Sequence, residues 1–373
     1  MNFITDVTAA FPPMLAAFAL AAVASLLVTP AVRRLVVQKG IVDRPEARRV
    51  NVVPIPRAGG LAVAAAFLAT AGLFLFLNDR EAYVPLPVFL TQEHLVALLL
   101  GGAGAAALGA IDDSFDLRAR WQLLIQLGLA AFAVWLGISI DAINNPFGPG
   151  AIRFDGLFAA GFTIFWIVGM MNSINWIDGL DGLSSGIALI AAVTLGIISL
   201  TTQVGQPLIA VLCFALAGSL LGFLRWNFHP AVIFAGTSGV QFIGYTIAVL
   251  SILGSAKVAV ALLVLGVPII DTFWIIVRRV SERRSPFTPD RSHIHHRMLD
   301  LGLSHRRTVL LIYGICVVLA ALALFLSGIS QLYAFLGVFL VFGLVLFVPT
   351  RGSLRAEELE AESYEDGPSP RVR

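Results

Sequence analysis

Apolar runs about as long as a bilayer is thick recur along almost the whole chain, and they constrain its fold more than any other feature. A bilayer-spanning helix needs about 20 consecutive apolar residues. Hydrophobic residues make up 58% of the 373 and charged residues only 13%, about half the share of a typical soluble protein. This composition excludes a soluble globular enzyme and a disordered chain, and the net charge of +2 excludes a nucleic-acid-binding protein. We therefore expect an integral membrane protein.

The polar breaks between the apolar runs predict eleven membrane spans, and hence an all-α, polytopic bundle of membrane helices. The run at 240–277 is too long for one helix, so we divide it at 254–257. We expect residues 1–350 to form one transmembrane domain and the tail at 351–373 to be disordered. The predicted spans are 9–29, 58–77, 94–111, 121–140, 157–174, 184–201, 206–224, 240–254, 258–277, 308–328 and 330–350.

The basic residues are divided unequally between the two sides that these spans define. One alternate set of connections carries 22 of the 25 basic residues, and the other carries only Arg80, Arg153 and Lys257. Cytoplasmic loops of membrane proteins are enriched in Lys and Arg. The basic set is therefore predicted to be cytoplasmic, with the N-terminus outside and the C-terminus inside.

Two adjacent carboxylates, Asp112 and Asp113, follow the span at 94–111 on the predicted cytoplasmic side. Adjacent carboxylates repel each other unless a cation lies between them, and Mg²⁺ typically uses one or two carboxylates together with phosphate oxygens. A magnesium site is one interpretation of this pair. An ordinary solvated loop is the other, and the pair alone does not decide between them.

A second polar cluster, at 172–183, begins at the predicted cytoplasmic end of the span at 157–174. Helical spacing of three would place four polar side chains in a slowly turning row. The glycines between them permit tight turns or a close approach of the backbone to a ligand. Polar side chains at the end of an apolar span are costly without a polar partner, which favours a binding site over a simple loop. The four are Asn172, Asn175, Asp178 and Asp181.

Three histidines within four residues form a third cluster on the same predicted side. Their neighbours Arg291 and Arg297 suit the recognition of phosphate or diphosphate through charge-assisted hydrogen bonds. A transition metal is the alternative, although no cysteine accompanies them. The three are His293, His295 and His296.

Arginines of the first predicted cytoplasmic loop, among them Arg49 and Arg57, would either hold an anionic lipid head group or only set the topology. Asp271 lies inside the predicted span at 258–277. An ionisable residue within a span is by default a candidate functional residue. Acids that could hold Mg²⁺ and bases that could hold a diphosphate therefore converge on one membrane face.

In this combination the chain resembles the polyprenyl-phosphate N-acetylhexosamine-1-phosphate transferases, a family of bacterial membrane enzymes. The resemblance extends from about residue 40 to residue 307. It rests on the Asp112-Asp113 pair, on NxxNxxDGxDGL at 172–183 and on PDxxHIHHR at 289–297. The His-Ile-His-His-Arg sequence resembles the one found in the branch of the family that starts O-antigen, common-antigen, teichoic acid or capsule-type glycans.

The resemblance implies transfer of a sugar 1-phosphate from a UDP-N-acetylhexosamine to undecaprenyl phosphate, with release of UMP and the start of a lipid-linked cell-envelope glycan. It implies a multi-pass plasma-membrane protein with a cytoplasmic active site, dependent on Mg²⁺ or alternatively Mn²⁺, with a homodimer as one possible state. The catalytic residues that it implies are Asp112, Asp113, Asp178 and Asp181, of which the first three would also hold the metal. The implied substrate-binding residues are Arg49, Arg57, Asn172, Asn175, Asp271, His293, His295, His296 and Arg297.

Two positions depart from the family pattern. Thr237 stands where the family usually has the Asp of a Gly-Asp pair that binds Mg²⁺, and Asn51 replaces a His before the Pro-x-Pro-Arg segment. A neutral hydroxyl is a weaker ligand than a carboxylate, so either other acids hold the metal or the activity is altered. Two alternatives stay open: a catalytically altered family member, and a transporter of an anionic or lipid-linked solute.

Overall fold

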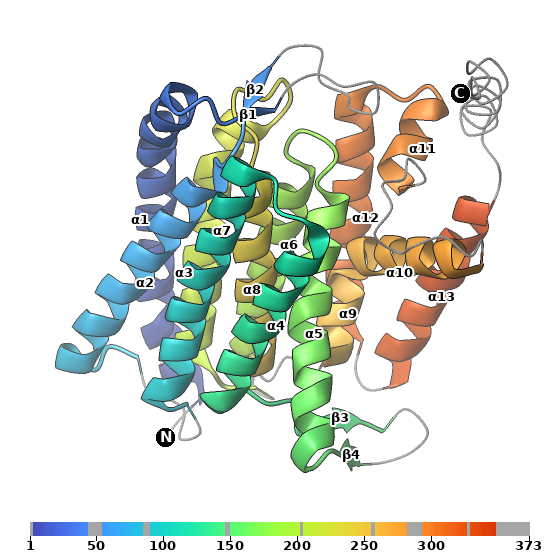
Figure 1. Cartoon of the computed structure of the whole chain (residues 1–373). Helices are drawn as coiled ribbons and strands as arrows, with labels where there is room; N and C mark the ends of the chain where they lie inside the picture. Colours follow the sequence, from blue (N-terminus) through green and yellow to red (C-terminus); the bar gives the residue numbers. More distant parts are fainter. Residues whose placement is uncertain are drawn as a thin grey trace, which may run out of the picture.

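A computed structural model describes residues 3–43, 54–84, 90–145, 150–201, 204–254, 258–281, 293–326 and 329–347. Most of these residues are helical (Figure 1). The helices are α1 (Phe3–Gln38), α2 (Gly60–Glu81), α3 (Gln92–Phe115), α4 (Ala119–Trp135), α5 (Gly156–Ile177), α6 (Leu183–Ser199), α7 (Pro207–Asn227), α8 (Gly236–Leu253), α9 (Val258–Val264), α10 (Gly266–Ser281), α11 (Ile294–Asp300), α12 (His305–Phe325) and α13 (Ile329–Phe347).

Two short antiparallel ribbons lie at opposite ends of the helix bundle. Strand β1 (Val42–Asp43) pairs with β2 (Ile55–Pro56), and β3 (Ala142–Asn144) pairs with β4 (Ala151–Arg153). Figure 1 shows β1, β2 and α11 at one end, with the connections α3–α4, α5–α6 and α7–α8. The N-terminus, β3 and β4 lie at the other end. We call the end with β1, β2 and α11 the polar end.

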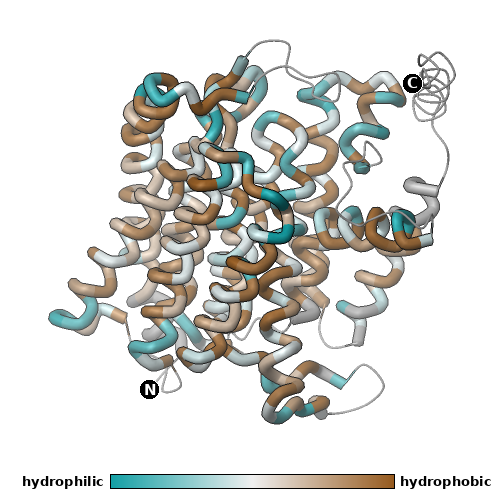
Figure 2. The backbone as a smooth tube through the Cα atoms, in the orientation of Figure 1, coloured by the Kyte–Doolittle hydropathy of each residue, from teal (hydrophilic) through white to brown (hydrophobic). Residues whose placement is uncertain are grey.

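Seven helices in the described part of the chain are long and apolar enough to cross a membrane, namely α1, α2, α3, α5, α7, α8 and α12. Hydrophobic residues dominate their middle turns, and hydrophilic residues gather toward the ends (Figure 2). Helices satisfy their own backbone hydrogen bonds, which a segment within lipid must do. The prediction of a polytopic membrane helix bundle is confirmed.

Helices α7 and α8 form the centre of the bundle, because most of their residues are buried. Helix α7 packs between α1 and α6, and α8 packs between α3 and α5. Two glycines one turn apart allow the closest of these contacts. A Cβ atom at Gly218 would lie 2.1 Å from the carbonyl oxygen of Phe18, and one at Gly222 would lie 2.2 Å from that of Ala22. Small residues at this spacing let two membrane helices approach closely.

The structure corrects three of the predicted elements. The predicted span at 258–277 is two helices, α9 and α10, and α10 lies across the direction of its neighbours (Figure 1). Its break coincides with Gly266 and Pro268, and a proline without an N–H is tolerated in the first turn of a new helix. Helix α1 continues beyond residue 29 to Gln38. The expected polar row leaves the helix after Ile177, so Asp181 lies in a loop.

The uneven distribution of basic residues corresponds to the two ends of the bundle. Arg80 lies in the last turn of α2 and Arg153 in β4, both at the end away from the polar end. Arg225, in the last turn of α7, and Arg297, in α11, lie at the polar end. The polar end thus carries most of the basic residues that the structure describes, since it also holds Arg33, Arg34, Lys39, Arg57, Arg118, Arg120, Arg306 and Arg307.

Candidate active site

Asp113 joins the end of α3 to the start of α8. Its side chain is 98% buried, and its two oxygens accept hydrogen bonds from the backbone N–H groups of Thr237 (2.9 Å) and Ser238 (3.0 Å). These N–H groups belong to the first turn of α8, where no helical carbonyl is available to them and where the helix dipole favours a negative charge. Asp113 therefore fixes α8 against α3 at the polar end.

Asp112 has different partners from those of its neighbour. Its Oδ1 accepts hydrogen bonds from the Leu117 backbone N–H at 2.9 Å and from the Gln122 side chain at 2.7 Å, which holds the turn between α3 and α4. Arg57 donates to the carbonyl oxygen of Asp113 at 3.0 Å. The same guanidinium donates to Asp116 at 2.7 Å. Arg57 therefore lies beside the acidic pair.

Asp178 and Asp181 lie in the connection between α5 and α6. The Ser184 hydroxyl donates to Asp178 at 2.5 Å. Burial, above all, together with the negative charges of Asp113 and Asp181, raises the pKa of Asp178 to about 7, although the Ser184 hydrogen bond acts to lower it. Three carboxylates thus lie within electrostatic reach of one another, which is an arrangement that a divalent cation would stabilise.

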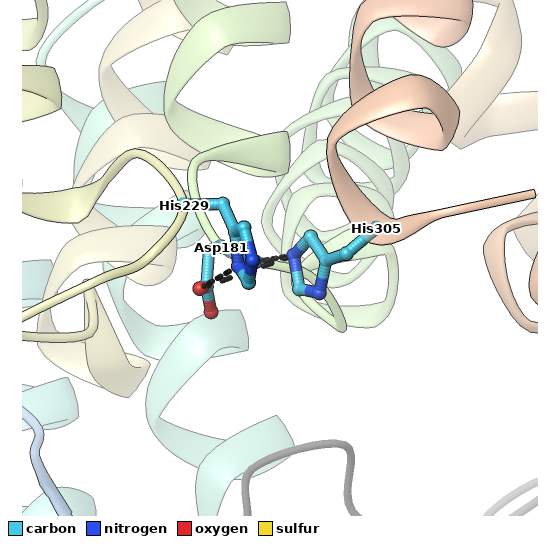
Figure 3. Close-up of side chains that lie close together, drawn as sticks. All are labelled: Asp181, His229 and His305. Atoms are coloured by element: carbon cyan, nitrogen blue, oxygen red, sulfur yellow. Dashed lines mark hydrogen bonds and ion pairs between the residues drawn. The ribbon is translucent and has the colours of Figure 1, made fainter.

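Asp181 also contacts two histidines from distant parts of the chain (Figure 3). Its Oδ2 lies 2.8 Å from Nδ1 of His229, in the connection between α7 and α8, and accepts the Ala231 backbone N–H at 3.0 Å. The Asp181 backbone N–H donates to Nε2 of His305, the first residue of α12, at 2.9 Å. The two imidazole rings stack with centroids 4.2 Å apart. Sequence reasoning missed both histidines as site residues.

The histidines at the start of α11 complete the polar end. Nδ1 of His293 lies 2.7 Å from Asp271, whose other oxygen accepts the Ile294 backbone N–H at 2.8 Å. The His293 ring stacks on His295 at 5.5 Å, and the His296 ring lies 4.4 Å from His295. Asp271, predicted as a substrate-binding residue, thus pairs with a member of the predicted histidine cluster and fixes the start of α11.

His295 is the most deeply buried of these histidines. It is 99% buried, and neither ring nitrogen has a hydrogen-bond partner within the described residues. Burial lowers the pKa of His295 well below its usual value, and the neighbouring histidines, first His296, lower it further, so the ring is neutral at pH 7. A Cβ atom at Gly179 would lie 2.0 Å from its Nε2. The absence of a side chain at Gly179 therefore lets His295 reach the loop between Asp178 and Asp181.

A chain of buried amides runs from the site into the bundle. The Asn172 side chain donates to Gln126 at 2.8 Å, and Gln126 donates to Gln241 at 3.0 Å. These residues belong to α5, α4 and α8, so the chain ties three helices together below the polar end. Asn175, one turn after Asn172, is partly buried at the end of α5.

The remaining predicted residues are placed as follows. Arg297 is buried within α11, and Arg49 lies outside the described residues, as do Arg291 and the predicted tail.

One signal in the sequence could have identified His229 and His305 as site residues. The chain has only six histidines, and five of them lie in predicted cytoplasmic connections. In the structure all five lie at the polar end, whereas His94 lies at the start of α3.

Comparison with known proteins gives consistent matches to one family. A family model described as glycosyl transferase family 4 matches residues 95–255. A Bacillus subtilis protein named "Probable undecaprenyl-phosphate N-acetylglucosaminyl 1-phosphate transferase" is 37% identical over 339 residues, which are 89% of each chain. The decaprenyl-phosphate N-acetylglucosaminephosphotransferase of Mycobacterium tuberculosis is 34% identical over 88% of this chain and 87% of its own. The undecaprenyl-phosphate alpha-N-acetylglucosaminyl 1-phosphate transferase of Yersinia pestis is 29% identical over 83% and 85%.

Proposed function

This chain belongs to glycosyl transferase family 4, and on that premise we propose that it transfers an N-acetylhexosamine 1-phosphate from a UDP-sugar to a polyprenyl phosphate. N-acetylglucosamine is the sugar that the names of its relatives give. The observation that carries the proposal is the meeting of Asp178, Asp181 and His295 at one end of an apolar bundle, where the His295 ring has no hydrogen-bond partner among the described residues. A lipid substrate can reach such a site from the membrane and a nucleotide from the water.

The reaction forms one bond and breaks another at a single phosphorus. An oxygen of the lipid phosphate attacks the phosphorus that bears the sugar, and the bond from that phosphorus to the bridging oxygen breaks, so UMP leaves. A phosphate monoester is already largely ionised at neutral pH, which makes a dedicated base unnecessary. Positioning and charge neutralisation would then supply most of the rate enhancement.

The acidic residues of the site suit a divalent cation. Asp178 has a pKa raised to about 7 by burial and by its acidic neighbours, so its ionised form lacks a counter-charge that Mg²⁺ would provide. Asp178 and Asp181 would hold the ion, and Mg²⁺, when bound, neutralises the diphosphate. Both oxygens of Asp113 and one of Asp112 accept backbone N–H groups. Each Asp113 oxygen keeps a second lone pair, and Asp112 keeps its other oxygen, so their part in metal binding stays a prediction.

The neutral His295 ring would hydrogen-bond the diphosphate or the sugar. Its one N–H can donate to a diphosphate oxygen, and a buried polar group gains most from a partner when it has none beforehand. His296 and Arg297, on the same short helix, would add charge-assisted hydrogen bonds. Arg57 would lie near the lipid phosphate, and the site would face the cytoplasm, because the polar end carries the basic residues.

The decisive experiment is transfer of radiolabel from a panel of UDP-sugars to undecaprenyl phosphate by the purified chain, with and without Mg²⁺. We expect labelled lipid and an equal amount of UMP with a UDP-N-acetylhexosamine, and neither product without a divalent cation. UDP-sugar binding without turnover would instead indicate the catalytically altered member that Thr237 suggests. Solute uptake into proteoliposomes without UMP release would indicate the transporter.

A further inference from the structure

The contact of Asp181 with His229 and His305 brings together three separate parts of the chain. Asp181 follows α5, His229 follows α7 and His305 begins α12. One ligand atom from each lies within 4.8 Å of the other two. Figure 3 shows the two imidazoles converging on the one carboxylate at the polar end. The proposed transfer assigns no role to either histidine.

The separations of these atoms match those around a small metal ion. Two ligands about 2.0–2.1 Å from one tetrahedral ion lie about 3.3 Å apart. Oδ2 of Asp181 lies 2.8 Å from Nδ1 of His229 and 4.0 Å from Nε2 of His305, so the two distances bracket that value. To bind an ion, the Asp181–His229 distance would have to lengthen and the Asp181–His305 distance to shorten, each by well under 1 Å.

The protonation states also suit metal binding. Nε2 of His305 accepts the Asp181 backbone N–H, so that nitrogen carries no proton, and a metal ion would take its one lone pair in place of that N–H. Nδ1 of His229 donates to the carboxylate, and a metal ion would replace that one proton. An anion is a poorer occupant, because the carboxylate of Asp181 would repel it.

We propose that Asp181, His229 and His305 form a binding site for a first-row divalent transition-metal ion such as Zn²⁺, a second ion that would share the Asp181 carboxylate with the Mg²⁺ of the proposed transfer. Imidazole nitrogens suit Zn²⁺, whereas Mg²⁺ requires oxygen ligands. Three protein ligands leave a fourth position open, which is the arrangement of ions that bind a further group. The His229 side chain is 39% exposed, so an ion from the solvent can reach the cluster.

The site would also stabilise the polar end. A bound ion would tie the α5–α6 and α7–α8 connections to the start of α12, in addition to the hydrogen bonds and ring stacking that already join them. A ligand that binds only the folded state raises its stability by mass action. The ion would therefore act on the position of the loop that also carries Asp178.

The test is zinc binding by the full-length chain in detergent micelles, expressed without a histidine tag and first stripped with a chelator. We expect about one tightly bound Zn²⁺ per chain, measured by competition with a chromogenic chelator, and a higher midpoint of thermal unfolding with zinc. His229→Gln and His305→Gln should each weaken zinc binding by roughly tenfold or more, because each removes one of three ligands. His94→Gln, at the start of α3, is the matched control and should bind zinc normally.

Two further measurements keep the outcome decisive. The His293–His296 cluster is the competing site, so loss of zinc in His295→Gln with normal binding in His229→Gln would overturn the proposal, as would a wild-type chain that retains none. In the wild-type chain, zinc should protect His229 and His305 from modification by diethyl pyrocarbonate, and unchanged modification would also overturn it. Transfer measured in parallel with Mg²⁺ alone tests the proposed function independently.

Discussion

Gly179 shows how one missing side chain shapes the candidate site. A Cβ atom there would lie 2.0 Å from Nε2 of His295, so Gly179→Ala must displace the buried ring. Displacing a substrate-contacting group by about 1 Å can cost about 10²-fold in rate. We expect a loss of about that size in UMP release. Gly161→Ala, on the exposed face of α5 with open space around it, should keep normal activity, and equal activity of both variants would contradict the role of His295.

The charge of Asp178 predicts a pH dependence of stability in the absence of a metal ion. Its pKa is about 7 in the folded chain and near 3.8 in an unfolded one, so the folded state binds the proton more tightly. Stability should therefore fall as the pH rises from about 4 to about 7 and level off above that. In Asp178→Asn the same fall should be weaker, and the midpoint of thermal unfolding at pH 8 should be higher than in the wild type.

The measurement is the midpoint of thermal unfolding in detergent between pH 5 and pH 8, with a chelator and then with Mg²⁺. Mg²⁺ should stabilise the wild type at pH 8 more than Asp178→Asn, since the variant has lost a ligand. Asp155→Asn, at the opposite end of α5, is the control because Asn retains the ability to cap a helix. A wild-type chain that is most stable at pH 8 without a metal would exclude the raised pKa.

At the scale of single residues, the sequence indicates which residues are candidates for the site but not which partners they contact. The residue types at 112–113 and 172–183 indicate a site, and the structure places them at one end. Their partners could not be predicted, because Asp113 meets Thr237 and Asp181 meets His229 only after α3, α5 and α8 have packed. The two neighbouring aspartates have separate partners, whereas repulsion between adjacent carboxylates was the expected feature.

The packing of α7 on α1 predicts a large effect of a small substitution. In Gly218→Ala, the added Cβ would lie 2.1 Å from a backbone oxygen of α1, which cannot move as a side chain can. Overpacking of this kind costs about 1–3 kcal/mol. We expect a midpoint of thermal unfolding several degrees lower than that of the wild type. Gly72→Ala on α2 has no atom near its Cβ and should leave the midpoint unchanged or raise it; an equal loss in both variants would argue against close α1–α7 packing.

The apolar runs predict most helices because burial in lipid and helix formation both require continuous apolar sequence. The prediction fails where the sequence stays apolar although the chain changes direction. Helices α9 and α10 together occupy the predicted span at 258–277, yet the chain turns near Gly266. Hydropathy averaged over about 20 residues cannot detect such a turn, whereas the Gly266-Val267-Pro268 sequence marks the start of a new helix.

For the whole molecule, the two ends differ in charge and so predict an orientation in the membrane. Because Lys and Arg favour the cytoplasmic side, the polar end should face the cytoplasm. The two native cysteines, Cys213 and Cys316, are buried, so a single introduced cysteine can be labelled against a low background. Exposed positions are available at both ends, in Asp300 of α11 and Arg153 of β4.

We expect a membrane-impermeant maleimide to label Arg153→Cys in spheroplasts and Asp300→Cys only in inverted membrane vesicles. Both positions are exposed and neither is assigned a role in the candidate site, so UMP release should be retained and serves as the control for folding. Labelling of Asp300→Cys in intact spheroplasts would place the polar end outside. A UDP-sugar made in the cytoplasm could not then reach Asp178 and Asp181, so this result would contradict the proposed orientation and the proposed transfer together.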